Sequence, residues 1–496
     1  MNEVRKGPAV NDTTTNANIA ASRQAEARLL TGGRWEEGEG APVPVLDKFL
    51  LTPVGHVRPA SARQVAVMVE AAAAAFRKGP PVAHERGEIL ARAAAIVAAR
   101  SRDFVAAMQG EAGFTLADAE GEVTRCLETL RLSAEEARRL TGDMLPLEGA
   151  PGQAGRLAFT LRVPLGVVAA ITPFNSPLNT VAHKVAPAFA AGNAVILKPS
   201  TSTPLTACLL AEALVEAGMP AGFLSVLHGG GEVARFLLDN GQVRFFAFTG
   251  STEVGRIIQA AAGLRRTQME LGSIAFTILG EDADLDRALP KVVNAGYRKA
   301  GQVCTSVQIL LVHEARRAEV ERRLAPMVAA LRCGDPRDPA TVVGPLIGEH
   351  EAVRVEAWIG EAVAGGARLL AGGTRSGPVV APTLLTDIRA DMKVGCAEIF
   401  GPVMCIAPFA TLDEAIDRVN STPFGLATGL FTQRLGDAFE AARRLEVGGV
   451  HINETSSARV DLMPYGGSKD SGFGREGPHY AIREMTEERV VSISTR

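Results

Sequence analysis

Residues 166–199 read GVVAAITPFNSPLNTVAHKVAPAFAAGNAVILKP, and their pattern predicts the fold class. Residues 166–172 are a short apolar run typical of a buried strand. Leu178 to Ala191 favour a helix that stops at Gly192, and 193–199 form a second apolar strand. Strand, helix and strand in this order indicate a parallel sheet covered by helices. The segment therefore predicts an α/β protein.

The same alternation continues on both sides of this segment. Ala-rich helices are expected over 62–108, and Thr203 is expected to cap a helix running from Pro204 to Gly218. Strands are expected over 223–229 and 243–250. Ligands bind parallel sheets at the carboxyl ends of the strands. The residues that leave the strands there, and so converge on one crevice, are Thr172 to Asn175, Lys198 to Thr201, and Thr249 to Gly255.

Composition narrows the class of protein. A chain of 496 residues, 47% of them hydrophobic, can form more than one core, because single cores stop growing near about 250–300 residues. The net charge is −3 without a long basic run, so no nucleic-acid partner is expected. No apolar stretch approaches the roughly 18 residues of a membrane span. Residues 1–25 are polar and lack the apolar centre of a secretory signal, so we expect a disordered tail and a soluble, cytoplasmic protein.

Two short segments carry groups suited to covalent chemistry. Six cysteines are scattered without a C-x-x-C pair, which indicates reduced thiols rather than disulfides or a zinc site. Gly301-Gln302-Val303-Cys304 places one thiol in a polar setting, where its thiolate would attack a carbonyl. Glu270 leaves a strand into a turn, where a carboxylate can take a proton from a thiol or a water. By themselves, these residues are better interpreted as a core cysteine and a surface glutamate.

A third segment, residues 250–255 (GSTEVG), ends a strand and opens a helix, where free backbone N–H groups can bind pyrophosphate. It is neither a P-loop nor the usual G-x-G-x-x-G, so a tight turn without a ligand stays an open alternative.

Seven motifs, in order along the chain from about residue 28 to the end, resemble those of the aldehyde dehydrogenase superfamily. They are ITPFNSP (171–177), KPS (198–200), FTGSTEVG (248–255), ELGS (270–273), GQVC (301–304), EIFGP (398–402) and PYGGSKDSG (464–472). One position departs from the family pattern, because Ser273 stands where the family has glycine.

The resemblance implies a division of chemical roles. Cys304 would add to an aldehyde, with the Asn175 side-chain amide and the Cys304 N–H stabilising the oxyanion. Hydride would pass to NAD or NADP. Glu270 would activate the water that hydrolyses the thioester, and Glu476 would relay protons.

The resemblance also assigns cofactor-binding residues. They are Thr172, Pro173, Phe174, Lys198, Ser200, Thr201, Thr249, Gly250, Ser251, Gly255, Leu271, Gly272, Glu398 and Phe400. Lys198 would hold the adenine ribose, while Glu398 and Phe400 would hold the nicotinamide ribose. Many NAD-preferring relatives carry a glutamate where this chain has Thr201. Because no carboxylate then repels a 2′-phosphate, NADP stands open beside NAD.

Substrate signals are thinner. The surroundings of Arg125 and Arg459 resemble family members that act on small anionic or hydroxylated aldehydes, and an arginine fork suits a carboxylate, phosphonate or sulfonate. Against this, phosphate-recognising relatives often have arginine where this chain has Val303. A structural salt bridge is the alternative for each arginine.

The sequence lacks the motifs of other enzyme classes. His228-Gly229-Gly230-Gly231 is similar to a lipase oxyanion loop, but no G-x-S-x-G supplies a serine nucleophile. The sequence contains no H-E-x-x-H motif, so no metal site is expected. A coenzyme A-acylating dehydrogenase is the nearest enzymatic rival, although such relatives usually lack the glutamate present as Glu270. A non-enzymatic protein on the same fold would have lost Cys304 or Glu270.

By resemblance, the architecture is a Rossmann-type NAD(P)-binding domain (26–141 and 163–272), an α/β catalytic domain (273–475), and a small β oligomerisation element (142–162 and 476–496). An exposed hairpin and a terminal strand can extend a neighbour's sheet, so a homodimer or homotetramer is expected.

Overall fold

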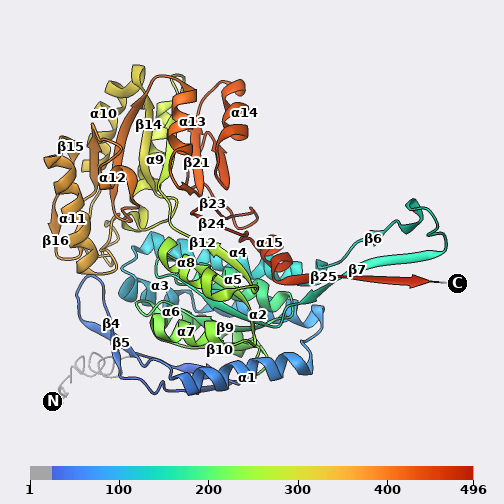
Figure 1. Ribbon diagram of the computed structural model, residues 1–496. Helices are drawn as coiled ribbons and strands as arrows, with labels where there is room; N and C mark the ends of the chain where they lie inside the picture. The colour runs from blue at the N-terminus through green and yellow to red at the C-terminus, as the bar shows by residue number, and fades with distance from the viewer. Residues whose placement is uncertain (1–24, 495–496) are drawn as a thin grey trace, which may run out of the picture.

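The computed structural model describes residues 25–494, so the tail predicted over 1–25 lies outside the described residues except for Ala25. The chain forms two α/β lobes and a projecting β arm (Figure 1). The parallel-sheet α/β class predicted from the sequence is confirmed.

An eight-stranded sheet organises the first lobe. In spatial order its strands are β24 (Gly472–Phe473), β12 (Arg266–Glu270), β11 (Val243–Thr249), β8 (Val167–Ile171), β9 (Ala194–Lys198), β10 (Leu224–Val226), β2 (Leu29–Thr31) and β3 (Arg34–Glu36). The five strands from β12 to β10 are parallel, and antiparallel strands close both edges. Strands β8 and β9 are buried along their whole length, which explains their uninterrupted apolar sequence.

Helices cover both faces of this sheet. They are α1 (Ala62–Lys78), α2 (Ala83–Ala99), α3 (Ser101–Glu111), α4 (Leu116–Arg139), α5 (Asn179–Ala190), α6 (Pro204–Glu216), α7 (Gly231–Asp239), α8 (Thr252–Ala262) and α15 (Pro478–Glu484). A small sheet of β1 (Ala25–Ala27), β5 (Pro53–Val57) and β4 (Val43–Leu46) flanks them. One local expectation was wrong, because the Thr203 side chain makes no cap hydrogen bond to α6. The buried Glu111 carboxylate instead accepts the N–H groups of Leu205 and Thr206, both at 2.7 Å.

The second lobe has its own seven-stranded sheet and its own core. The strands in order are β15 (Arg368–Ala371), β18 (Thr383–Thr386), β19 (Val403–Phe409), β14 (Val307–His313), β13 (Ala275–Leu279), β21 (Ala427–Phe431) and β22 (Gly449–Ile452). All neighbours are parallel except β15. The helices are α9 (Leu285–Tyr297), η2 (Arg298–Gly301), α10 (Glu314–Ala329), α11 (Glu349–Ala364), α12 (Lys393–Cys396), α13 (Leu412–Asn420) and α14 (Leu435–Arg444), and the hairpin strands are β16 (Arg375–Ser376) and β17 (Val379–Val380).

One stretch, the crossing segment 468–473, joins the two lobes. Its first part, β23 (Ser468–Lys469), pairs with β20 (Phe424–Gly425) of the second lobe. Its second part, β24, adds to the sheet of the first lobe by pairing with β12. The segment therefore holds both lobes through backbone hydrogen bonds.

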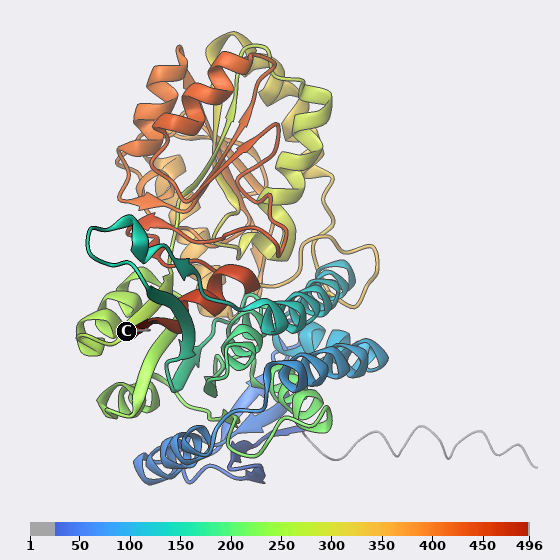
Figure 2. The same ribbon diagram turned by 90° about the vertical axis from the view of Figure 1, so that its right-hand side faces the viewer.

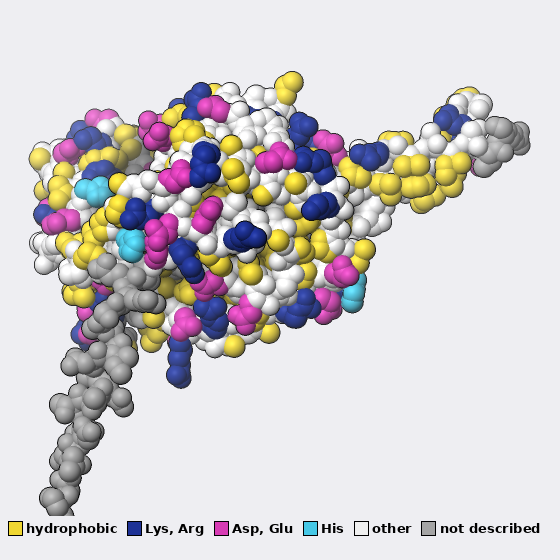
Figure 3. Space-filling model, turned by 90° about the horizontal axis from the view of Figure 1, so that it is seen from below, with side chains coloured by type: hydrophobic (Ala, Val, Ile, Leu, Met, Phe, Trp, Pro, Cys, Tyr) yellow, Lys and Arg dark blue, Asp and Glu magenta, His cyan; other side chains and the backbone are white. Residues whose placement is uncertain are grey.

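The arm leaves the first lobe and points away from both cores (Figures 1 and 2). It contains β25 (Thr486–Ser494), β7 (Arg156–Pro164) and β6 (Met144–Leu145), with η1 (Leu147–Gly149) in its loop. Hydrophobic side chains line its surface (Figure 3). The exposed ones are Met144, Leu157, Leu161, Val490 and Ile493. Within residues 25–494, no helix is long and apolar enough to span a membrane.

Candidate active site

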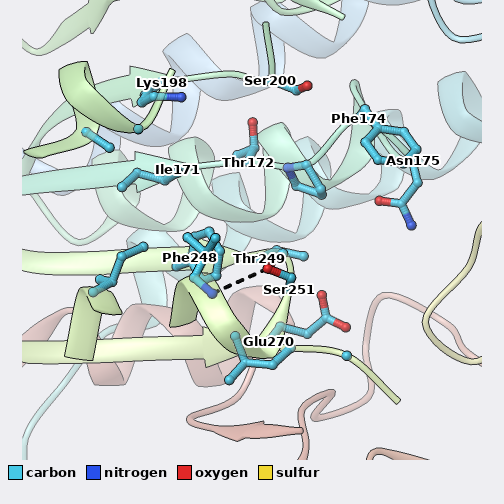
Figure 4. A pocket seen from close by; sticks show the side chains of 18 of the residues that line it. Ile171, Thr172, Phe174, Asn175, Lys198, Ser200, Phe248, Thr249, Ser251 and Glu270 are labelled. Carbon is cyan, nitrogen blue, oxygen red and sulfur yellow. Dashed lines mark hydrogen bonds between the residues drawn. The ribbon is translucent and has the colours of Figure 1, made fainter. Parts of the chain in front are cut away.

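A cavity of about 680 Å³ opens at the carboxyl ends of β8, β9, β11 and β12. It is lined by all but one of the residues assigned to the cofactor by sequence: Thr172, Pro173, Phe174, Lys198, Ser200, Thr201, Thr249, Gly250, Ser251, Leu271, Gly272, Glu398 and Phe400. Figure 4 shows Asn175 and Glu270 projecting into one end of this pocket, with Lys198 toward the other. Successive strand ends thus bring together residues that are far apart in sequence, as expected for a parallel sheet.

Gly255 is the residue that does not line the cavity. A Cβ at this position would lie 2.4 Å from a methyl carbon of Leu271, so glycine lets α8 pack closely against the turn after β12. Its role is to bring the N-terminus of α8 to the cavity wall. The Ser251 hydroxyl caps that helix by accepting the Val254 N–H (Figure 4).

The triglycine Gly229–Gly231 also lines the cavity, and sequence reasoning did not assign it to the cofactor. Gly230 and Gly231 begin α7, and a Cβ on either would meet open space. The backbone N–H groups of a helix N-terminus favour an anion. The sequence signal for it is the HGGG stretch at 228–231, which also resembles an oxyanion loop.

The cavity has polar groups that suit a dinucleotide. Burial lowers the pKa of Lys198 to about 8 and raises the pKa of Glu398 to about 7. The Thr172 hydroxyl is buried and has no hydrogen-bond partner among the described residues, which fits a ligand at this wall. Gly272 leaves space beside Glu398, because a Cβ there would lie 2.8 Å from its Oε2. The residues present therefore fit an extended ligand with hydroxyl and phosphate groups.

The Cys304 loop comes from the second lobe and is tightly constrained. Lys299 and Ala300 adopt left-handed φ angles of 52° and 54°, which are costly for residues with a Cβ. Gly301 follows with φ 70°, and a Cβ there would come 2.1 Å from the Gly401 carbonyl oxygen. Glycine at 301 is therefore required by both backbone conformation and space.

Lys299 fixes this loop against the first lobe. Its buried ammonium donates to the Glu122 carboxylate at 2.7 Å and to the Asn175 carbonyl at 3.0 Å. Asn175 in turn donates from Nδ2 to the Gln302 carbonyl at 2.9 Å. The oxyanion donor predicted from sequence is thus tied to the loop that bears Cys304.

The predicted nucleophile and base lie beside one another. The Cys304 sulfur lies 2.9 Å from the Tyr465 hydroxyl, which also donates to Glu270 at 3.4 Å. Burial, then the charge of Glu476, raises the pKa of Glu270 to about 7. Burial and the nearby Glu270 raise the pKa of the Cys304 thiol well above its usual value. A carboxyl group that titrates near neutrality is suited to general-base catalysis.

Two cationic side chains surround Glu476, the residue that the sequence predicts to relay protons. Although burial opposes ionisation, Lys184 and Arg459 hold its pKa well below the usual range. Both pairs are 3.0 Å long, and the Thr249 hydroxyl donates to the same carboxylate at 3.2 Å. The negative charge of Glu476 in turn raises the pKa of Glu270.

A second cavity, of about 310 Å³, adjoins the first. Cys304, Glu270, Asn175 and Thr249 line both cavities. The reactive groups therefore lie between the two cavities. The first cavity suits a dinucleotide, and the second suits a small molecule.

Arg125 and Arg459 line the second cavity, but each already has a carboxylate partner. Arg125 forms two hydrogen bonds to Asp461, of 2.6 and 3.3 Å. Arg459 pairs with Glu476, and its guanidinium lies 3.7 Å from the centre of the Tyr465 ring.

Arg298 is a cavity-lining arginine that sequence reasoning missed. Its guanidinium donates to the Ser457 hydroxyl at 3.2 Å, and no carboxylate pairs with it anywhere in residues 25–494. Burial lowers its pKa, and the charges of Asp118 and Glu122 oppose that shift without cancelling it. The missed signal was its position in the RKAGQVC stretch, at the start of η2.

A dinucleotide-sized cavity on a parallel sheet, with a cysteine and a titrating glutamate at its end, defines a nicotinamide-dependent oxidoreductase. The profile of the aldehyde dehydrogenase family matches residues 35–491. The chain belongs to the aldehyde dehydrogenase family.

Individual proteins that are similar to this chain support the family assignment. A 3-sulfolactaldehyde dehydrogenase of Priestia megaterium is 45% identical over 94% of this chain and 98% of its own. Aldehyde dehydrogenase 21 of Physcomitrella patens, solved with the reaction product succinate, is 35% identical with a TM-score of 0.93, covering 95% of this chain and 99% of the other. The glyceraldehyde-3-phosphate dehydrogenase GapN of Methanocaldococcus jannaschii, solved with NADP, is 34% identical with a TM-score of 0.87, covering 91% and 99%. Enzymes of this family use NAD or NADP.

Proposed function

We propose that this enzyme oxidises a small aldehyde bearing an anionic or hydroxyl group to its carboxylic acid, through a thioester on Cys304. The observation that carries the proposal is that Cys304 and Glu270 line both cavities, so one pair of groups faces cofactor and substrate together. Relatives named for sulfolactaldehyde, and for lactaldehyde in Methanococcus vannielii, support the substrate class.

In the first step the Cys304 thiolate adds to the aldehyde carbon. The Asn175 side-chain amide and the Cys304 N–H donate to the developing oxyanion, and removal of one such donor typically slows a reaction by about 10²–10³. Glu398 and Phe400 would hold the ribose of an oxidised nicotinamide, whose chemistry would be to accept hydride from the aldehyde carbon. Glu270 then takes a proton from the water that hydrolyses the thioester, which releases the acid and restores the thiol.

Arg298 is the proposed contact for the anionic group of the substrate. It is buried in the wall of the second cavity with the Ser457 hydroxyl beside it and no carboxylate paired to it. Arg125 and Arg459 face the same cavity, and they contribute to its positive potential while fixing the loop that carries Asp461. This revises the expected anchor from Arg125 and Arg459 to Arg298.

The proposed cofactor is NADP as well as NAD. Thr201 lines the cavity where a carboxylate would repel a 2′-phosphate, and Lys198 and the N-terminus of α7 lie on the same wall. We also propose that the arm mediates a homodimer or homotetramer, because β25 and β6 are open edges with exposed apolar side chains. The proposed location is the cytoplasm, as the sequence indicated.

A panel of aldehydes assayed with each cofactor tests the function. Short semialdehydes and sulfonated or hydroxylated aldehydes should exceed benzaldehyde and hexanal in kcat/KM. Added coenzyme A should leave the product a free acid, because Glu270 supplies the base for water. Preference for hexanal would contradict the substrate class, and an acyl-coenzyme A product would favour the acylating alternative.

A further inference from the structure

The Tyr465 hydroxyl contacts both reactive groups of the site. Its oxygen lies 2.9 Å from the Cys304 sulfur, and its hydrogen is donated to Glu270 Oε1 at 3.4 Å. With that donor direction, the thiol hydrogen of Cys304 points to the tyrosine oxygen. Cysteine, tyrosine and glutamate therefore form a continuous hydrogen-bonded chain.

The tyrosine is held in place from two sides. Its backbone pairs with Glu476 by two hydrogen bonds, of 3.1 and 2.6 Å. Its ring lies under the Arg459 guanidinium at 3.7 Å, and Arg459 is itself fixed by Glu476 at 3.0 Å. A hydroxyl so constrained is preorganised, which is what a catalytic hydrogen bond requires.

The Cys304 thiol must lose its proton before the sulfur can attack an aldehyde. Burial raises the pKa of the Cys304 thiol, so little thiolate forms without a neighbour that accepts the proton and then stabilises the negative sulfur. The pKa of Glu270, raised to about 7 chiefly by burial, makes it a suitable final acceptor.

We propose that Tyr465 is a catalytic residue that passes the Cys304 proton to Glu270 and then donates a hydrogen bond to the thiolate. This inference rests on the proposed role of Cys304 as nucleophile. The S–H bond breaks as a new O–H bond forms on tyrosine. The original tyrosine O–H breaks as an O–H bond forms on Glu270. No electrons are transferred, and the net change is one proton from thiol to carboxylate.

After this step, both hydrogen bonds of the chain run in the opposite direction. The tyrosine now holds the former cysteine hydrogen and donates it to the negative sulfur, while the protonated Glu270 donates to the tyrosine oxygen. Because 3.4 Å exceeds an ideal O–H···O separation, the second link must shorten by roughly 0.5 Å as the proton moves. Such tightening is common when a catalytic site engages its ligand.

The test is the alkylation of Cys304 by iodoacetamide across pH 6 to 10, measured as the rate at the Cys304 peptide by mass spectrometry. Peptide resolution is needed because Cys333 and Cys396 are more exposed than Cys304 and will react too. Tyr465→Phe keeps the ring and removes the hydroxyl. We expect its rate at neutral pH to fall roughly ten- to hundredfold, the range for a hydrogen bond to a charged group. The pH midpoint should rise by about 1–2 units.

Tyr480→Phe, the same change on α15, is the matched control and should react like the unchanged enzyme. An unaltered rate and midpoint in Tyr465→Phe would overturn the inference. The proposed function would fail separately, if Cys304→Ala retained aldehyde oxidation.

A second measurement does not depend on the folding of Tyr465→Phe. Replacing the three tyrosines of the chain by 3-fluorotyrosine makes their hydroxyls more acidic. A more acidic donor stabilises the thiolate better, so the pH midpoint of Cys304 alkylation should fall. A midpoint that stays in place would contradict the proton transfer.

Discussion

Asn175 donates a hydrogen bond of 2.9 Å to the carbonyl of Gln302, two positions before Cys304. The amide that is proposed to stabilise the oxyanion therefore also fixes the loop that carries the nucleophile. A side-chain amide nitrogen bears two hydrogens, so one can hold Gln302 while the other meets the substrate oxygen.

Asn175→Ala should lower kcat/KM by about 10²–10³, the usual effect of removing one oxyanion donor. Steady-state rates with a saturating cofactor measure it. Cofactor fluorescence and thermal unfolding serve as controls and should change little. A decrease in kcat/KM of less than threefold would show that Asn175 does not stabilise the oxyanion.

Cys304→Ala should abolish aldehyde oxidation and leave cofactor binding near its original value, because the cavity wall at Lys198 and Gly231 does not depend on the thiol. Titration of bound cofactor and an oxidation assay check both parts. Cys333→Ala, which changes an exposed cysteine elsewhere, should retain full activity. Substantial turnover by Cys304→Ala would refute the thioester mechanism.

Steady turnover should depend on the ionisation of Glu270. Its pKa is raised to about 7, chiefly by burial, and the base is active only as the carboxylate. The rate should therefore be half of its maximum near pH 7, level off about one pH unit above it, and fall about tenfold per pH unit well below it. Glu270→Gln should lose this steady rate, and its first burst of reduced cofactor should be slower as well, because the Tyr465 chain then has no carboxylate to accept the Cys304 proton. Stopped-flow absorbance measures both rates. A burst at the unchanged rate would confine Glu270 to thioester hydrolysis and contradict the Tyr465 chain.

Thr201→Glu should shift preference from NADP toward NAD, because the new carboxylate would repel the 2′-phosphate and bind the ribose hydroxyls. The ratio of kcat/KM for the two cofactors is the measurement. Ser202→Glu places the same charge one residue further along, outside the cavity lining, and should have a smaller effect. An unchanged ratio in Thr201→Glu would show that other residues select the cofactor.

Arg298→Ala should lower kcat/KM for anionic aldehydes roughly ten- to hundredfold, the range for a charge-assisted hydrogen bond, and spare neutral aldehydes of equal length. Arg125→Ala is the comparison. It leaves Asp461 short of a partner, so we expect lower thermal stability and equal losses on both substrates. A loss specific to anions in Arg125→Ala would instead restore the anchor expected from sequence.

Much of the site was predictable because strand ends are visible in sequence. Apolar runs located β8, β9 and β11, and the residues after them necessarily meet at one edge of a parallel sheet. The pairing of Arg125 with Asp461 was not predictable, since the two are brought together only by tertiary folding. The same holds for Glu111, whose carboxylate caps α6 in place of Thr203. Tyr465 lay within a recognised motif, but its contact with Cys304 needed coordinates.

The crossing segment 468–473 has a thermodynamic consequence. Its two short strands pair with strands of different lobes, β23 with β20 and β24 with β12, so neither pairing can be lost without disturbing the other. The segment begins three residues after Tyr465, so the same stretch of backbone links the reactive centre to both cores. Denaturation is therefore expected to be a single cooperative transition, and a protease cut within this segment would inactivate the enzyme before either core melted.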